Sequence, residues 1–318
     1  MMYKYILVLI LGVIILTGCT KENSTAPVTL TDQSVIKQQV AEIDSIADFS
    51  SSDEATINDD SVQEWNTDGM GKVLSPINPI LWGRKIDNIQ RTVDVSIEGD
   101  SIATAVIIKI ITGRLIVLAT YPDSNMPTTF QKQFTQEVRR EVKFRRIARN
   151  EDISKNWKPI AITTVVGKTI VRNFDITEII IYTPNDTITI SDSLMHWFWF
   201  REPRELPIRI PILNAGDSVR IRVKIISENS NNEYVMIRHC VDHRFTKRYR
   251  LRMDVVDSTQ HQGLYERQYE RRFKVRLPMG VIMSRYNAIV DVFSYESLND
   301  DTAPYMNEFV GIPYIVVK

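Results

Sequence analysis

The chain has 318 residues, and its 39 basic and 39 acidic residues give a formal net charge of zero. Only two cysteines occur, and glycine is scarce at 12 residues. The sequence contains no Gly-x-Ser-x-Gly, His-Glu-x-x-His or phosphate-loop motif, which excludes the enzyme classes that depend on those motifs. We therefore expect a protein that is not an enzyme, with no catalytic residue, no metal and no cofactor.

The first residues predict a secretion signal. Lys4 supplies a short positive region, and the run from Ile6 to Leu16 is apolar and broken only by Gly12. This run is shorter than the ~20 apolar residues that a membrane-spanning helix needs. It therefore predicts a cleaved signal peptide over residues 1–18.

The signal ends in the tetrapeptide Leu16-Thr17-Gly18-Cys19. This sequence resembles the lipobox of bacterial lipoproteins, with an aliphatic residue and two small residues before the cysteine. The resemblance implies that the Cys19 thiol carries diacylglycerol, that cleavage precedes Cys19 and that the new amino terminus is also acylated. Several acyl chains hold a protein firmly on a membrane, whereas one chain binds only marginally. The alternative is an ordinary cleaved signal with an incidental cysteine.

The resemblance also implies a location. We expect the mature protein in the bacterial cell envelope, bound to membrane lipid through acylated Cys19. The next residue is Thr20 and not aspartate. This favours the outer membrane, on its periplasmic or surface side, if the organism has two membranes.

A tether and a helix follow the lipobox. Residues 19–29 are small and polar and predict a flexible tether. Thr31 is a suitable N-cap, and Ile36, Val40 and Ile43 follow at spacings of four and three. This spacing predicts one face of an amphipathic helix of roughly four turns.

Alternating strands are predicted from Trp82 onward. Three apolar side chains share one face, and three polar ones share the other: Val93, Val95, Ile97 and Asp94, Ser96, Glu98. A hairpin turn at 98–101 leads into an apolar strand over 102–111, and Thr112-Gly113 suggests another turn. The segment 134–148 fits a strand or a helix. We interpret it as a strand because Trp157–Val166 is clearly another.

One helix on a curved antiparallel meander is similar to the NTF2-like (SnoaL-like) domain. The resemblance implies an α+β domain over residues 30–166. Enzymes of that family carry a carboxylate or histidine base in a pocket. No residue of this chain can be assigned to such a base.

Every recognisable element of residues 167–318 is a strand, and the candidates include 217–227, 246–254 and 264–276. In 217–227, apolar residues alternate with basic ones: Val219, Ile221, Val223, Ile225 inward and Arg220, Arg222, Lys224 outward. Short strands at roughly ten-residue spacing resemble an immunoglobulin-like β-sandwich. Without Cys19 only Cys240 remains, so the sandwich has no internal disulfide. We expect the domain boundary between residues 165 and 173.

The first candidate interaction surface is an unbroken aromatic run. Its members are Trp197, Phe198, Trp199 and Phe200. Three interpretations are open, namely a sugar-stacking platform, a membrane-dipping loop and a packing wedge. Each ring can bury ~150–250 Å², so we predict a loop that packs at least two rings. Nearby charged residues such as Arg201 and Glu202 argue against deep insertion in lipid.

The second candidate surface is basic. In the segment 264–276, Arg267 and Arg271 alternate with Glu266 and Glu270. Such a face can meet phosphate or an acidic polymer. Outside the cytoplasm the partner would be a lipid headgroup or an anionic glycan, and not nucleic acid. The alternative is a solvated sheet face on which arginine and glutamate pair across strands.

Two further groups have the residue types of metal ligands. His239, Cys240 and His243 suit zinc or copper by type, but their spacing is poor. Residues 296–301 offer oxygen ligands for calcium but lack the Asp-x-Asp-x-Asp-Gly pattern. We interpret the first group as a structural cysteine beside surface histidines, and the second as a turn.

Together these features predict a lipid-anchored cell-envelope protein with a binding or scaffolding role. Its partner would be an unidentified envelope protein or glycan. One alternative is an envelope enzyme that uses the pocket of an NTF2-like domain. Another is a glycan-binding surface protein.

Overall fold

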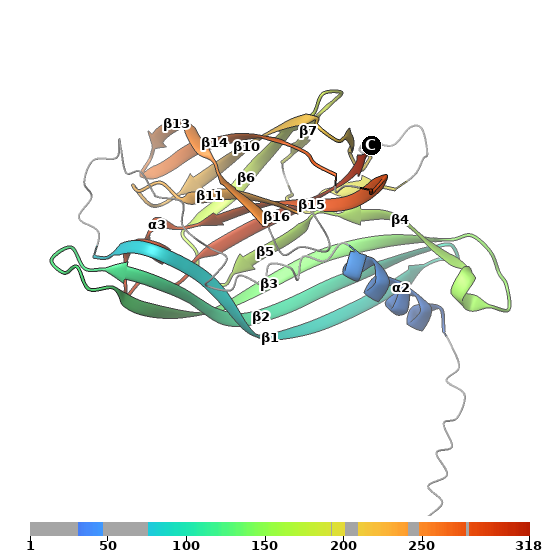
Figure 1. Cartoon of the computed structure of the whole chain (residues 1–318). Helices are drawn as coiled ribbons and strands as arrows, with labels where there is room; N and C mark the ends of the chain where they lie inside the picture. The colour runs from blue at the N-terminus through green and yellow to red at the C-terminus, as the bar shows by residue number, and fades with distance from the viewer. Residues whose placement is uncertain (1–30, 47–75, 192, 201–208, 241–247, 278–279) are drawn as a thin grey trace, which may run out of the picture. The chain divides into compact units, whose positions relative to one another are not determined.

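The computed structural model describes residues 31–46, 76–191, 193–200, 209–240, 248–277 and 280–318. Within it, Asp32–Lys318 form one compact unit built almost entirely from antiparallel strands (Figure 1). The predicted signal peptide, Cys19 and the tether lie outside the described residues.

The elements of this unit are α2 (Asp32–Ile46), β1 (Asn78–Glu98), β2 (Ile102–Thr120), β3 (Thr128–Arg146), η2 (Ile153–Lys155), β4 (Trp157–Thr163), β5 (Val165–Thr169), β6 (Phe174–Tyr182), β7 (Thr187–Ile190), β8 (Trp197–Trp199), β9 (Ile212–Asn214), β10 (Ser218–Ser227), β11 (Tyr234–Cys240), β12 (Arg248–Arg252), β13 (Asp254–His261), β14 (Leu264–Lys274), β15 (Met283–Phe293), α3 (Tyr295–Asn299) and β16 (Asn307–Val317).

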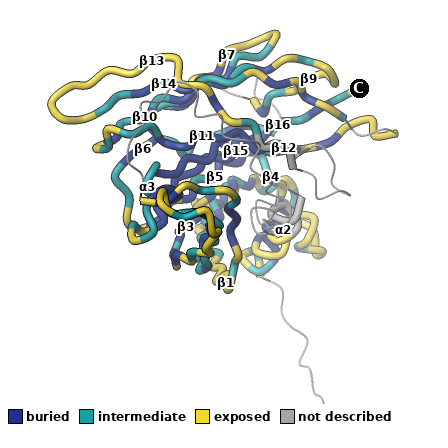
Figure 2. Tube along the Cα trace, turned by 60° about the vertical axis from the view of Figure 1, so that its left-hand side comes forward, coloured by how far each residue is buried: buried dark blue, intermediate teal, exposed yellow. Residues whose placement is uncertain are grey.

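The described strands form two sheets. The large sheet has the order β1-β2-β3-β5-β16-β15-β11-β12, with β4, β8 and β9 joined to it at the side. The small sheet has the order β13-β14-β10-β6-β7. Apolar side chains of both sheets share one core, to which Ile179 and Val223 contribute from the small sheet and Val290 and Ile312 from the large one. Figure 2 shows buried residues concentrated along β11, β15 and the strands beside them.

The structure confirms the predicted helix and the period-two strands. Ile36 and Val40 of α2 are fully buried, and the Asp32 carboxylate accepts hydrogen bonds from Arg146 and from the Trp157 indole. The side chains of β10 alternate as expected between the core and the outside. The strand interpretation of the segment around Val138 is also confirmed.

The predicted turn at Thr112-Gly113 is wrong, because β2 runs unbroken from Ile102 to Thr120. Gly113 pairs with Ile86 on one side and with Phe134 on the other. A Cβ atom there would collide with the Lys85 carbonyl oxygen and lie 3.0 Å from Phe134 Cζ. The glycine therefore serves close packing of neighbouring strands instead of a turn.

The large sheet continues across the expected domain boundary. Gly167 of β5 pairs with Val138 of β3 and with Phe309 of β16. The Phe309 ring lies where a Cβ atom of Gly167 would be, so this junction is tightly packed. The segments 30–166 and 167–318 thus share one sheet.

At one end the large sheet divides. β4 and β5 pair with successive stretches of β3 and are separated at Thr164. β5 continues the sheet to β16, whereas β4 pairs with β8. β9 pairs with the last residues of β16, and Trp199 of β8 forms a bridge with Arg209 just before β9. β8 and β9 therefore fill the gap that opens between β4 and β16, which we call the sheet division.

A buried polar network lies inside the large sheet. The Asp291 carboxylate accepts hydrogen bonds from Arg84 Nη2 at 2.9 Å and from Asn307 Nδ2 at 2.8 Å, and Arg238 Nε lies 3.1 Å from it. Arg84 also donates to the Tyr305 hydroxyl at 3.1 Å. Burial raises the pKa of Tyr305 to about 12, so this hydroxyl stays protonated. Two cations and a carboxylate are thus held together away from water.

Candidate functional site

Three residues of the aromatic run, Trp197–Trp199, form a short strand, β8, and not the predicted loop. Trp197 pairs with Thr163 of β4, and Phe198 pairs with Ile162. Such pairing fixes the direction of each ring, because side chains alternate between the two faces of a strand.

The four rings divide between the core and the surface. Phe198 is fully buried in the core that the two sheets share, and Phe200 packs against the same core. The prediction that at least two rings pack is therefore confirmed. Trp197 and Trp199 point to the opposite face and are partly exposed. The Lys143 ammonium lies 4.9 Å from the centroid of the Trp197 ring, within range of a cation–π contact.

Hydrogen bonds to residues 160–164 hold both ends of β8. The Thr164 amide donates to the His196 carbonyl at 2.8 Å, and the His196 amide donates to Thr164 Oγ1 at 2.9 Å. The Phe200 amide donates to the Ile160 carbonyl at 2.9 Å. The two tryptophans are thus presented by a fixed strand.

His196 points to the core side of this strand. Its ring lies 5.3 Å from the Phe198 ring in an edge-to-face arrangement. Burial lowers the pKa of His196, so the neutral imidazole is favoured there. The histidine therefore contributes to packing more than to charge.

The basic candidates do not form one surface. Arg267 is buried, where Nη1 donates to Glu233 at 2.8 Å and Nη2 donates to the carbonyls of Asn229 and Ser230. The expectation of an exposed Arg267 is therefore corrected. Arg271 is partly exposed, with Nη1 3.2 Å from the Asp254 carboxylate.

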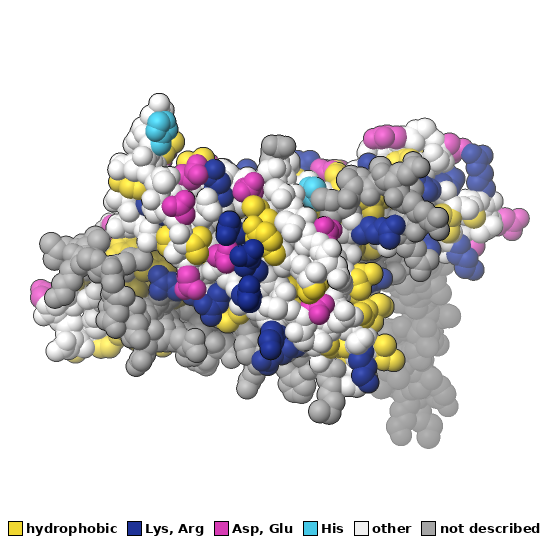
Figure 3. Space-filling view, turned by 90° about the horizontal axis from the view of Figure 1, so that it is seen from above, with side chains coloured by type: hydrophobic (Ala, Val, Ile, Leu, Met, Phe, Trp, Pro, Cys, Tyr) yellow, Lys and Arg dark blue, Asp and Glu magenta, His cyan; other side chains and the backbone are white. Residues whose placement is uncertain are grey.

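The outward face of the small sheet carries the remaining charges of this segment. Figure 3 shows Lys and Arg side chains in a band on this side of the molecule, with acidic side chains beside it. Arg222 pairs with Glu270 at 2.8 Å, and Lys224 pairs with Glu266 at 2.8 Å. For these residues the cross-strand pairing of a solvated sheet face is observed.

Where β10 begins and β14 ends, acids no longer stand opposite bases. Arg220 stands directly opposite Arg272, and Ser218 stands opposite Lys274. Arg272 and Lys274 are exposed and form no ion pair with any described residue. We call Arg220, Arg272 and Lys274 the basic end of the small sheet.

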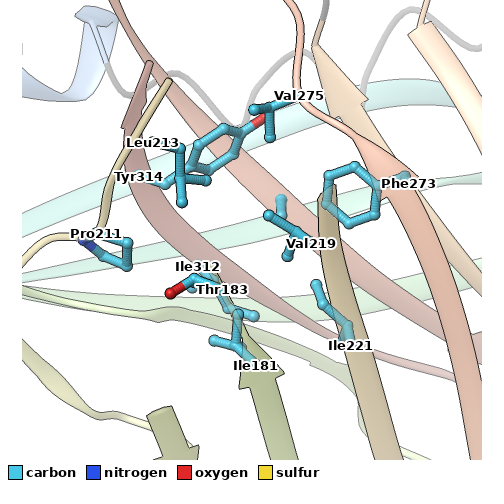
Figure 4. A pocket seen from close by; sticks show the side chains of 11 residues that line it. Ile181, Thr183, Pro211, Leu213, Val219, Ile221, Phe273, Val275, Ile312 and Tyr314 are labelled. Carbon is cyan, nitrogen blue, oxygen red and sulfur yellow. The ribbon is translucent and has the colours of Figure 1, made fainter. Parts of the chain in front are cut away.

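A cavity lies between the two sheets and is shown in Figure 4. Its volume of about 20 Å³ holds about one water molecule. The lining is almost wholly apolar and comes from both sheets: Ile181, Thr183, Pro211, Leu213, Val219, Ile221, Phe273, Val275, Ala288, Ile312 and Tyr314. It is too small for an organic substrate, since such sites measure roughly 300–1,000 Å³.

The candidate calcium loop contains an internal cation. The Lys132 ammonium donates to the carbonyl oxygens of Glu296 at 3.1 Å and Ser297 at 2.8 Å, and also to that of Asp300. Burial lowers the pKa of Lys132 to about 8. The segment itself is the short helix α3 and a turn, in which the Asp300 carboxylate accepts from the Thr302 amide at 2.7 Å. Lysine thus occupies carbonyl oxygens that a metal ion would need.

The other metal candidate lies largely outside the described residues. His239 and Cys240 belong to β11, but their side chains and His243 are not described. Within the described part of the chain, no group of three or more histidine, cysteine, aspartate or glutamate residues is arranged to hold a metal. The helices described there are all too short or too polar to cross a membrane.

Comparison with known proteins gives no relative for this chain. No family model matches it, and neither a curated protein nor a solved structure is significantly similar.

Proposed function

We propose that the protein is a lipid-anchored component of the bacterial cell envelope that binds or scaffolds an envelope partner. The Leu16-Thr17-Gly18-Cys19 sequence supports the anchor. The partly exposed pair Trp197 and Trp199 carries the binding role, because it is presented by a strand fixed by pairing with β4. Rigid aromatic side chains contribute strongly to binding at low entropic cost.

We also propose that the N-terminal segment is NTF2-like and that the C-terminal segment is an immunoglobulin-like sandwich. An NTF2-like arrangement of the N-terminal segment is supported by α2, which packs against β1, β2 and β4 and contributes Ile36 and Val40 to the core. An immunoglobulin-like sandwich is supported by the core that the small sheet shares with β11, β15 and β16.

An envelope enzyme is the rival function. It would need a deep pocket with two or three converging titratable side chains. The cavity of Figure 4 instead is water-sized, and Tyr314 is its sole titratable residue. This favours the binding role over pocket chemistry at that place. Glycan binding remains the second candidate, since the two tryptophans share one exposed face.

Replacing Cys19 by alanine is expected to abolish lipidation. Without acyl chains the protein should leave the membrane fraction or accumulate unprocessed, because no other anchor is proposed. Membrane extraction and intact mass of the wild-type and C19A proteins measure this. A variant with unchanged mass and unchanged membrane association would refute the anchor.

Replacing Trp197 and Trp199 together by alanine is expected to abolish capture of the envelope partner. The measurement is a pull-down from native envelope with the tethered wild-type and double-variant proteins. A Val255→Ala variant is the control, since Val255 is an exposed apolar residue of β13, in the other sheet. Equal recovery of every partner by the wild-type and the double-variant proteins would contradict the proposed surface.

A further inference from the structure

The charges on the outward face of the small sheet are unevenly distributed. Toward the β13–β14 hairpin, Lys224 and Glu266 form a 2.8 Å pair, and Glu178 stands opposite Lys224 on β6. Further along, Glu270 accepts from Arg222 at 2.8 Å and lies 3.5 Å from Arg220. This part of the face holds acids and bases in similar number.

The basic end has no such balance. Arg220 and Arg272 are direct cross-strand neighbours, and like charges in that position destabilise a sheet. Lys274 follows on the same face of β14, with the neutral Ser218 opposite. The nearest acid along β10 is Asp217, whose carboxylate accepts from the Asn214 amide in the turn. Of the basic end, Arg220 alone reaches a carboxylate, that of Glu270 at 3.5 Å, whereas Arg272 and Lys274 pair with no acid of the described residues.

An aromatic ring on the neighbouring strand holds the Arg220 side chain in place. Its guanidinium carbon lies 4.0 Å from the centroid of the Tyr182 ring, which is its neighbour on β6. The next strand places Thr187 opposite Tyr182. Arg272, Arg220, Tyr182 and Thr187 therefore form one row across four strands, which spans roughly 14 Å at about 4.8 Å between neighbouring strands.

We propose that this row and Lys274 form a binding site for an anionic polysaccharide. Guanidinium groups bind sulfate, phosphate and carboxylate oxygens with two parallel hydrogen bonds, and the hydroxyl groups of Tyr182 and Thr187 suit sugar hydroxyls. A row of this length fits an extended polymer better than one headgroup. The row itself carries no exposed aliphatic side chain that would enter a bilayer. The choice of a glycan rests on the proposed envelope location, whereas the site rests on the geometry.

Binding of dextran sulfate to the detergent-solubilised full-length protein tests this site, with neutral dextran as the control polymer. We expect dextran sulfate alone to bind, with affinity that falls as salt increases. Arg272→Ala and Lys274→Ala should each weaken binding roughly fivefold, the upper end for a solvent-exposed ion pair. Lys224→Ala is the matched control, because it removes the same charge from the same face at a residue already paired with Glu266.

A second measurement separates binding from structure. Arg272→Gln removes the like-charge neighbour of Arg220, so the melting temperature should rise while affinity for dextran sulfate falls. A residue with a purely structural role would not show these opposite changes. Equal weakening by Lys224→Ala, equal binding of neutral dextran, or binding only to vesicles containing phosphatidylglycerol would each overturn the proposal. Membrane release of C19A is measured independently, so the location and the site can fail separately.

Discussion

Replacing Asp291 by asparagine is expected to lower the free energy of unfolding by roughly 3–5 kcal/mol. The carboxylate lies within 3.1 Å of nitrogen atoms of both Arg84 and Arg238, and the three side chains are at most 3 % exposed. Asparagine keeps the size of the side chain but removes its charge, which leaves two guanidinium groups buried without their carboxylate. Equilibrium unfolding in urea, followed by circular dichroism, measures the loss.

Asp87 provides the matched control for this substitution. Its carboxylate pairs with Arg114 at 3.1 Å, but both side chains are at least 31 % exposed. Asp87→Asn should therefore change the free energy of unfolding by less than about 1 kcal/mol. If Asp291→Asn were as mild as the control, the buried network would not be a major source of stability.

Replacing Phe198 by alanine is expected to cost roughly 3–5 kcal/mol of unfolding free energy. The ring is fully buried in the shared core and belongs to the strand that fills the sheet division. Its loss leaves a cavity between β4 and β16 that the flanking hydrogen bonds of β8 prevent from closing. The same urea unfolding experiment measures this effect.

The neighbouring tryptophans provide the comparison. Trp197→Ala and Trp199→Ala should each lower the unfolding midpoint, but by less than Phe198→Ala, because both rings are partly exposed. A larger loss of stability from either tryptophan would show that the outward face of β8 contributes more to stability than its inward face.

The sequence predicts the strands of this protein where burial alternates. Val219, Ile221 and Val223 have a period of two, and β10 is found where that period predicts a strand. β13 escaped prediction because all eight of its residues are exposed, so it has no apolar period. The turn predicted at Gly113 is wrong because sequence alone does not distinguish a glycine that permits close strand contact from one that permits a turn.

In the candidate site, too, the sequence prediction failed for a residue whose burial depends on distant partners. The sequence predicts Arg267 on the surface. However, Tyr269 and Phe273 lie on the same face of the strand as Arg267, and such apolar residues indicate the core side. That apolar context was a signal that the arginine is buried. Its partner Glu233 is 34 residues away, and Asp291 lies 207 residues from Arg84. Such pairs depend on the topology of the sheet, which local periodicity does not determine.

The central position of β16 has a consequence for the order of folding. This strand lies between β5 and β15 and pairs with both, although some 140 residues separate Glu308 from its partner Lys168. The strands β1, β2, β3 and β5 therefore cannot join β15, β11 and β12 in one sheet until residues 307–317 are available. Folds dominated by such non-local pairing have high contact order and fold slowly, on the order of milliseconds to seconds. Closure of the large sheet therefore waits until β16 has been synthesised, however early the meander of β1, β2 and β3 forms.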